Sequence, residues 1–151
     1  MKNVDLIAKT LEEAGVQWVF GVPSGPVLPL INALEKTSVS YVLTASETSA
    51  GFMATAVGSL TGTPGVCLST LGPGATNMVT GIACASMDSS AIVAITGQVP
   101  RSGIGKDFFQ ETDTTGVTLP ITKHNYLVMR AEDIPRIIHE AFYIASTGRP
   151  G

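Results

Sequence analysis

The stretch Val39-Ser-Tyr-Val-Leu-Thr-Ala-Ser-Glu-Thr-Ser-Ala-Gly-Phe-Met-Ala54 passes from an extended apolar pattern directly into a helical one. Residues 39–43 predict a short strand, and the apolar residues that follow Glu47 fall on one helical face as far as Leu60. The segment Gly62-Thr-Pro-Gly65 then breaks the chain before a second predicted strand at residues 66–69. Glu47 therefore lies where a strand hands over to a helix inside a strand-helix-strand unit.

The same alternation continues on both sides of this unit. Further strands are predicted at residues 17–20, 91–96 and 126–129, and further helices at residues 4–14, 26–36, 78–85 and 132–145. The run Ala91 to Thr96 is continuously apolar up to its last residue, which is typical of a central parallel strand buried on both faces. We therefore expect one α/β domain, a doubly wound, mostly parallel sheet flanked by helices in three layers.

Composition excludes several classes of protein. The chain has 151 residues, enough for one domain with a core. Its net charge of -3 and scattered basic residues argue against nucleic-acid binding. The N-terminal residues do not resemble a signal peptide, and no apolar run is long enough to span a bilayer, so we expect a cytoplasmic protein that binds no membrane. Only 14% of the residues are charged, which suggests that part of the surface is covered by a partner.

Glu47 stands in a segment that is unusually poor in charge. The sixty-four residues between Lys36 and Arg101 contain no Lys, Arg or His and only two acids, Glu47 and Asp88. Burial of the Glu47 carboxylate without a cationic neighbour should raise its pKa, as suits a group that shares a proton in acid-base chemistry. The alternative is a solvated glutamate that is favoured at the first turn of a helix by the helix dipole.

Four loops should gather with Glu47 at the carboxyl edge of the sheet, where ligands of such folds bind. They are residues 21–26, 44–47, 70–77 and 97–113, which we take as rich in Gly or Pro and poor in charge. Such loops predict a close-fitting pocket for a flat, largely uncharged group. The turn Gly72-Pro-Gly-Ala-Thr-Asn77 lacks the features of both nucleotide-binding loops, and its glycines could also serve only as a tight connection.

The remaining reactive side chains suggest no site. Cys67 and Cys84 have no metal-ligand spacing and are expected to be buried, inert thiols. His124 and His139 lie late in the chain, at a strand end and within the last helix, and form no catalytic set with a nucleophile. We predict no metal ligands in this chain.

Six runs of the sequence occur in an order that is typical of one known family. They are Phe20-Gly-Val-Pro-Ser-Gly-Pro-Val-Leu-Pro29, Ser69-Thr-Leu-Gly-Pro-Gly-Ala-Thr-Asn-Met-Val-Thr-Gly-Ile-Ala83, Thr96-Gly-Gln-Val-Pro100, Asp107-Phe-Phe-Gln-Glu-Thr-Asp113, Pro120-Ile-Thr-Lys-His124 and Ala145-Ser-Thr-Gly-Arg-Pro-Gly151. With these runs the chain resembles the N-terminal, pyrimidine-binding domain of thiamine-diphosphate-dependent enzymes, and most closely the acetolactate synthase large subunit. The six runs extend over nearly the whole sequence.

The resemblance implies a catalytic role for Glu47. A glutamate at this position hydrogen-bonds N1′ of the cofactor's aminopyrimidine, so that the 4′-imino group can take the proton of the thiazolium C2 and form the ylide. The ylide then attacks a 2-keto acid such as pyruvate. The cofactor supplies the difficult chemistry, and the protein positions it.

Other residues take roles by the same resemblance. Positions that border the pyrimidine are Pro23, Gly25, Gly72, Pro73 and Asn77. Residues on the substrate side are Pro26, Phe109 and Gln110, and Gln110 is also a catalytic candidate.

Departures from the family pattern leave the substrate open. Ser46 stands where acetolactate synthases usually carry His, and the first loop reads Gly21-Val-Pro-Ser-Gly-Pro26 where Gly-Tyr-Pro-Gly-Gly-Ala is usual. The leading expectation is a 2-keto acid carboligase. The alternatives are a 2-keto acid decarboxylase or oxalyl-CoA-type lyase, and a non-catalytic binding module of the same fold.

The resemblance also implies partners. In the family, the diphosphate and Mg²⁺ are held by a C-terminal domain with a Gly-Asp-Gly motif, which residues 1–151 lack, as they lack the central domain. We therefore expect this chain to be inactive alone and to work with such a domain of the same or a partner chain. A homodimer or homotetramer is expected, and FAD is possible in the full-length enzyme.

Overall fold

The computed structural model describes residues 2–151 and is built on one parallel sheet. Its four strands are β1 (Trp18–Gly21), β2 (Ser40–Leu43), β3 (Gly65–Ser69) and β4 (Ile92–Thr96). They are ordered β2-β1-β3-β4, and every neighbouring pair is parallel. The register places Phe20 opposite both Val42 and Cys67, which in turn lies opposite Ala94.

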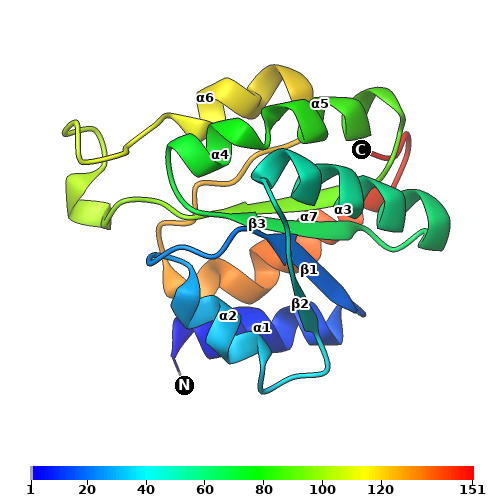
Figure 1. Ribbon diagram of the computed structural model, residues 1–151, viewed down its shortest axis with the longest axis horizontal. Helices are drawn as coiled ribbons and strands as arrows, with labels where there is room; N and C mark the ends of the chain where they lie inside the picture. Colours follow the sequence, from blue (N-terminus) through cyan, green and yellow to red (C-terminus); the bar gives the residue numbers. More distant parts are fainter. Residues whose placement is uncertain (1) are drawn as a thin grey trace.

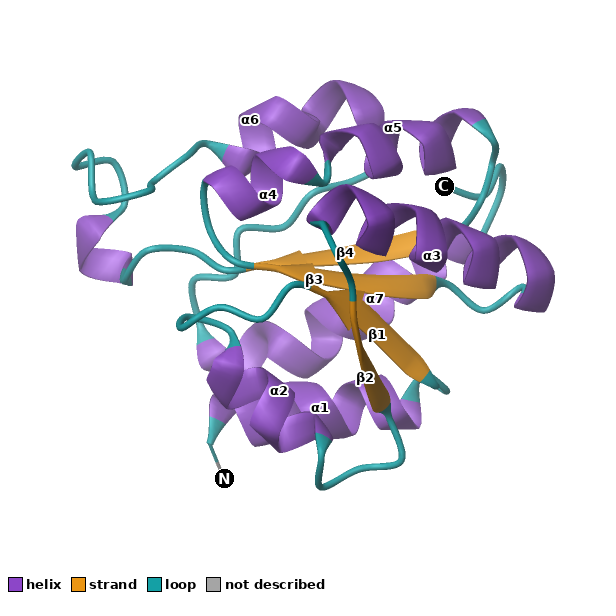
Figure 2. Cartoon of the chain, in the orientation of Figure 1, coloured by secondary structure: helices purple, strands orange, loops and turns teal. Residues whose placement is uncertain are grey.

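Helices cover both faces of the sheet (Figures 1 and 2). The lower layer contains α1 (Asn3–Glu13), α2 (Leu28–Leu34) and α7 (Ile134–Ser146), and the upper layer contains α3 (Glu47–Thr61), α4 (Pro73–Asn77), α5 (Val79–Met87) and α6 (Thr114–Thr118). Short 3₁₀ turns occupy Arg101–Gly103, Leu119–Ile121 and Ala131–Asp133. The predicted three-layer, doubly wound α/β class is confirmed.

Two apolar clusters fill the space between sheet and helices. The lower cluster joins α1, α2 and α7 to residues such as Val19, Val66 and Leu68 on one face of the sheet. The upper cluster joins Ala50 and Ala54 of α3 and Ile82 of α5 to Phe20 and Cys67 on the other. Because successive side chains of a strand point to opposite faces, Val19 and Phe20 divide between the two clusters.

Local signals explain where α3 begins and ends. The Ser46 hydroxyl accepts the backbone N–H of Ser49 at 3.1 Å, which is a helix N-cap. Gly62 closes the helix with a φ of 74°, a left-handed conformation that glycine adopts without steric cost. Glu47 is therefore the first helical residue, at the predicted junction between strand and helix.

The prediction that residues 91–96 form a central strand is wrong. Residues 92–96 form β4 at an edge of the sheet, where they are partly exposed, and β3 is instead the strand whose residues are all buried. Both segments are apolar, and an apolar run does not specify which neighbours the sheet will provide.

The strand predicted at Tyr126 to Met129 is also wrong, because this segment is extended but has no ladder with β4. Side-chain contacts hold it instead: the Tyr126 hydroxyl donates to Glu140 at 3.2 Å, and Arg101 donates to the carbonyl of Met129 at 3.3 Å. The last helix begins at Ile134, two residues later than predicted, after a 3₁₀ turn. None of the helices in residues 2–151 is long and apolar enough to cross a membrane.

Candidate functional site

The loops that follow β1, β2, β3 and β4 meet at the carboxyl edge of the sheet. The chain reverses its direction of winding between β1 and β3, the place where ligands of open α/β sheets usually bind. Backbone bonds join neighbouring loops: Thr44 N–H donates to the carbonyl of Gly21, and Gly97 N–H donates to the carbonyl of Ser69, both at 2.9 Å. The four predicted loops are thus brought together.

Glu47 is half-buried at this edge, and only one of its two carboxylate oxygens accepts a hydrogen bond within the described chain. Its Oε2 accepts the side-chain amide of Asn77 at 3.2 Å, while its Oε1 has no hydrogen-bond donor within residues 2–151. No Lys, Arg or His of the described chain forms an ion pair with it. The Thr48 hydroxyl donates to the carbonyl of Asn77 at 2.6 Å, which fastens the first turn of α3 to the end of α4. One carboxylate oxygen is therefore fixed and the other is free.

The free oxygen lies against a glycine. A Cβ added at Gly74 would stand 3.4 Å from Oε1 of Glu47 and 2.6 Å from the methyl group of Thr70. Any larger residue at Gly74 would therefore push into the space between Glu47 and Thr70.

Within residues 2–151, three hydroxyl groups at the same edge of the sheet are buried without a hydrogen-bond partner. They are Oγ of Ser24, Oη of Tyr41 and Oγ1 of Thr70, from the loop after β1, from β2 and from the loop after β3. Leaving such groups unpaired is costly in a folded protein, so each calls for an explanation. Ser24 and Thr70 lie in the loops at the point where the strand order reverses.

Tyr41 lies in β2, and its side chain packs toward the lower layer of helices. Its hydroxyl would lie 3.1 Å from a Cβ added at Gly21, and its ring packs against the lower cluster. Burial and then the negative charge of Glu47 raise the pKa of Tyr41 to about 12. The phenol therefore keeps its proton to a higher pH than an ordinary tyrosine does.

The long segment after β4 docks on the glycine turn of residues 70–74. The carbonyl oxygen of Gln110 lies so close to Gly72 that a Cβ there would clash with it. Gly72 has a φ of 53° and Gln110 a φ of 60°, so both residues take left-handed conformations at the contact. The segment projects on the left of Figure 1 and presents Phe109 to solvent, with 83% of that residue exposed.

The structure brings some of the predicted site residues into contact and not others. Glu47 touches Asn77, and Gln110 touches the turn at Gly72 that Pro73 continues into α4. Pro23, Gly25 and Pro26 are exposed in the loop after β1, at the same edge of the sheet. No hydrogen bond joins that loop's side chains to Glu47 within the described chain.

Three residues of the site have no predicted role. They are Thr70, Gly74 and Ser24, all of which lie within the predicted loops. The glycine-rich spacing around Thr70 was the available signal, whereas the unpaired state of the hydroxyls depends on contacts that only the folded chain provides.

The thiols of Cys67 and Cys84 differ in their burial. Cys67 is fully buried, and burial raises the pKa of its thiol to about 12, in agreement with the predicted inert cysteine. Cys84 is only half-buried, so its predicted burial is partly wrong. The described residues hold no group of three or more His, Cys, Asp or Glu side chains that could bind a metal ion.

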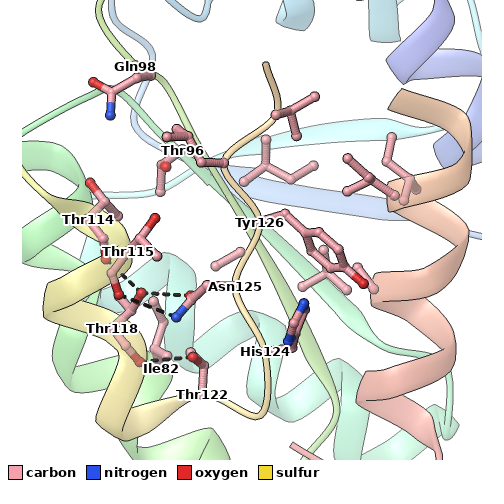
Figure 3. A pocket seen from close by; sticks show the side chains of 18 of the residues that line it. Ile82, Thr96, Gln98, Thr114, Thr115, Thr118, Thr122, His124, Asn125 and Tyr126 are labelled. Atoms are coloured by element: carbon pink, nitrogen blue, oxygen red, sulfur yellow. Dashed lines mark hydrogen bonds between the residues drawn. The ribbon is translucent and has the colours of Figure 1, made fainter. Parts of the chain in front are cut away.

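A cavity of about 540 Å³ lies away from Glu47, between β4, α7 and the extended segment of residues 122–129 (Figure 3). Its wall is mostly apolar and includes Ile82, Ala94 and Ile138. Asn125 is fixed on one side by the Thr118 hydroxyl, which donates to it at 2.9 Å. Neither Glu47 nor Asn77 lines this cavity.

Comparison with known proteins identifies the family of this chain. The family described as thiamine pyrophosphate enzyme, N-terminal TPP binding domain, matches residues 1–117. The chain belongs to this thiamine pyrophosphate enzyme family. It is 52% identical over 152 residues to the acetolactate synthase large subunit of Mycobacterium tuberculosis, an alignment that covers 100% of this chain and 25% of that protein.

Other relatives in the thiamine pyrophosphate enzyme family are similar to the same extent. The large subunit of acetolactate synthase isozyme 1 from Escherichia coli is 48% identical over 150 residues, covering 99% of this chain and 27% of the relative. The chloroplastic acetolactate synthase of Arabidopsis thaliana is 51% identical over 151 residues, covering 99% of this chain and 22% of that relative. The chain thus spans about a quarter of the length of the curated relatives it matches.

Membership of the thiamine pyrophosphate enzyme family implies thiamine diphosphate as cofactor, and the residues at the sheet edge fit its aminopyrimidine. The ring carries nitrogen atoms that can share a proton with a carboxyl, and Glu47 has one oxygen without a donor. Gly74 keeps the space beside that oxygen open, and the hydroxyls of Ser24 and Thr70 lack partners. These polar groups at the sheet edge therefore lack hydrogen-bond partners that a bound polar ring would supply.

Proposed function

We propose that this chain is the aminopyrimidine-binding domain of a thiamine-diphosphate-dependent 2-keto acid carboligase of the acetolactate synthase type. The observation that carries the proposal is the half-buried Glu47 carboxylate, with Oε2 fixed by Asn77 and Oε1 free beside Gly74. Thiamine diphosphate, when bound, would supply the nucleophilic thiazolium carbon that reacts with a 2-keto acid such as pyruvate.

Glu47 would hold or share a proton with N1′ of the aminopyrimidine through Oε1. The absence of an ion-pair partner in the described chain suits a group that must exchange a proton, because a neighbouring cation would favour the permanently ionised form. Asn77 would orient the carboxyl by its bond to Oε2, as a group that supports an acid-base residue does in other enzymes. Gly72, Gly74 and Pro73 would give the ring close access to Glu47.

The loops would complete the site. Pro23, Gly25 and Pro26 would border the ring from the loop after β1, and Phe109 and Gln110 would reach over cofactor and substrate. On the same resemblance we propose that a separate domain, of the same or a partner chain, holds the diphosphate and Mg²⁺. We propose a cytoplasmic homodimer or homotetramer as the working form, inactivity of residues 1–151 alone, and FAD as a possible further cofactor of the whole enzyme.

A decarboxylase or oxalyl-CoA-type lyase is the second candidate, favoured by Ser46 in place of the usual His. In the structure, the Ser46 hydroxyl bonds the Ser49 N–H and lies 3.0 Å from the Ser49 hydroxyl, so it serves to cap α3. Analysis of the products formed from pyruvate separates the two, because a carboligase yields acetolactate and a decarboxylase yields an aldehyde.

Replacement of Glu47 tests the proposal. In the complete enzyme, Glu47→Gln keeps the shape of the side chain but removes the proton-sharing carboxyl, and should lower the rate of pyruvate consumption about 100-fold to 10,000-fold. The matched control is Asp88→Asn, which removes the other acid of the same charge-poor span, exposed at the end of α5. Full activity of Glu47→Gln would refute the assigned role.

A further inference from the structure

Glu111 closes the loop that carries Phe109 and Gln110. Its side chain turns back, so that Oε1 accepts the backbone N–H of Gly105 at 2.5 Å and Oε2 accepts that of Phe108 at 3.0 Å. The N–H of Glu111 itself donates to the carbonyl of Phe108 at 2.8 Å. One carboxylate therefore spans both ends of the segment from Gly105 to Phe108.

The loop adopts a conformation that needs this support. Asp107 and Gln110 have φ values of 52° and 60°, in the left-handed region that residues other than glycine rarely adopt. Such conformations persist where the surrounding structure enforces them. Between the turn that ends at Gly103 and α6, few backbone bonds are present in the described chain, namely those from Lys106 N–H to the carbonyl of Gly103 and from Glu111 N–H to that of Phe108. The Glu111 carboxylate is therefore a main fixed point of the segment.

The charge of Glu111 is maintained by the same contacts. Bonds from the backbone N–H groups of Gly105 and Phe108, and weaker ones from Lys106 and Asp107, hold the pKa of the Glu111 carboxyl below its ordinary value. The charged residues near Glu111 in the loop are Lys106, Asp107 and Asp113, and residues 70–77, on which the loop docks, carry no charge. Charge-assisted hydrogen bonds of this kind are stronger than neutral ones.

The loop connects Glu111 to Glu47 through a short series of contacts. Gln110, the residue before Glu111, is in direct contact with Gly72. Gly72 immediately precedes α4, and Asn77 at the end of α4 bonds Glu47. Displacement of the loop would therefore move Gln110 away from the turn at Gly72.

We propose that Glu111 is a positioning residue, whose carboxylate binds the backbone of Gly105 and Phe108 and thereby fixes the loop that holds Gln110 against Gly72, in the turn that leads through α4 to Asn77 and Glu47. It acts through Gln110 and does not itself touch substrate. The expected effect on kcat/KM rests on the proposed function. The expected effect on the loop conformation rests on the loop contacts alone.

The test uses the complete enzyme loaded with thiamine diphosphate, and the variant Glu111→Gln. The amide has one acceptor oxygen, so one of the two N–H groups loses its partner and faces an NH₂ group. Hydrogen exchange, followed by mass spectrometry in the peptide that spans residues 104–110, should accelerate about tenfold or more, the effect of losing one charge-assisted hydrogen bond. In the same variant kcat/KM for pyruvate should fall about tenfold, while the affinity for thiamine diphosphate stays within about threefold of the parent.

Two further variants separate positioning from general stability. Gln110→Ala should lower kcat/KM similarly but leave the exchange of Gly105 and Phe108 unchanged, and the double variant should be no worse than the poorer single one, because both act through one side chain. Glu132→Gln, at an exposed glutamate whose ion-pair partner is Arg130 at 3.6 Å, is the matched charge control and should change neither readout. Glu111→Asp should restore part of the kinetic loss.

Unchanged exchange in Glu111→Gln would overturn the binding of the loop backbone by Glu111. Faster exchange with unchanged kcat/KM, or additive losses in the double variant, would overturn the positioning role. If Glu47→Gln retains full activity, the proposed function fails by itself, and the exchange measurement still decides whether Glu111 fixes the loop.

Discussion

At the scale of single residues, the site is defined by polar groups whose bonding is incomplete. Glu47 has one bonded and one free carboxylate oxygen, and Thr70 and Ser24 have buried hydroxyls without partners. Natural proteins seldom leave buried polar groups unpaired, and such groups concentrate where a ligand binds. Tyr41 is the third such residue, and its phenol can be tested in the protein without a ligand.

Tyr41 should make the protein sensitive to alkali. Its pKa in the folded state is about 12 and therefore above the ordinary value of 10.0, so the folded form retains the phenol proton that the unfolded form loses. The free energy of unfolding should then be independent of this group below pH 10 and fall between about pH 10 and pH 12. Denaturant titrations across this range in the Tyr41→Phe variant should show a smaller fall.

Tyr143→Phe, which removes an exposed phenol of α7, serves as the control and should keep the full pH dependence of the parent. An unchanged slope in Tyr41→Phe would show that the Tyr41 phenol is not the responsible group.

At the scale of elements, the position of Glu47 depends on how closely α3 packs on α5. Gly51 and Gly81 meet at the crossing, where a Cβ on Gly81 would lie 2.8 Å from the Cα of Gly51 and 3.3 Å from the carbonyl oxygen of Thr48. Both contacts involve backbone atoms, which cannot move aside like a flexible side chain. The first turn of α3, with Glu47 and Thr48, is thus set by this glycine pair.

Gly81→Ala should therefore separate the two helices despite the higher helix propensity of alanine. We expect a loss of about 1–3 kcal/mol in the free energy of unfolding, the usual cost of overpacking, measured by urea denaturation. Thr80→Ala, at the neighbouring exposed position of α5, should cost less than about 0.5 kcal/mol. A stabilised Gly81→Ala variant would mean that helix propensity outweighs the close contact.

At the scale of the whole molecule, the surface is poor in charge and carries large apolar side chains. On the outer side of α3, Phe52 and Met53 are 45% and 44% exposed, and Leu60 is 86% exposed. Leu43, just before this helix, is 68% exposed. Apolar groups gathered on one region of a surface are typical of an interface, and the chain spans only about a quarter of its relatives.

We expect residues 1–151 to self-associate through the outer side of α3. Leu60→Glu places a charge on this surface and should raise the dissociation constant about tenfold, measured by sedimentation velocity over a wide range of concentration. Tyr143→Glu, a comparable change at a 70% exposed residue of α7, is the control. A monomer at all concentrations would contradict the expectation.

The extent of sequence-based prediction differs between the fold and the site. The alternation of strands and helices, the start of α3 at Glu47 and the irregular segment after β4 all follow from patterns within about twenty residues. The edge position of β4 and the absence of a strand at residues 126–129 do not, because pairing in a sheet joins segments far apart in the chain.

By itself the sequence determined the α/β class and the placement of Glu47 at a junction between strand and helix, since periodicity and capping are local properties of the chain. The tertiary structure alone decided that Asn77 bonds one oxygen of Glu47 and leaves the other free, that Gln110 rests on Gly72, and that Glu111 clasps its loop. The first two of these contacts join residues thirty or more positions apart, and the third depends on a left-handed backbone. Their geometry exists only once the sheet has brought the loops to one edge.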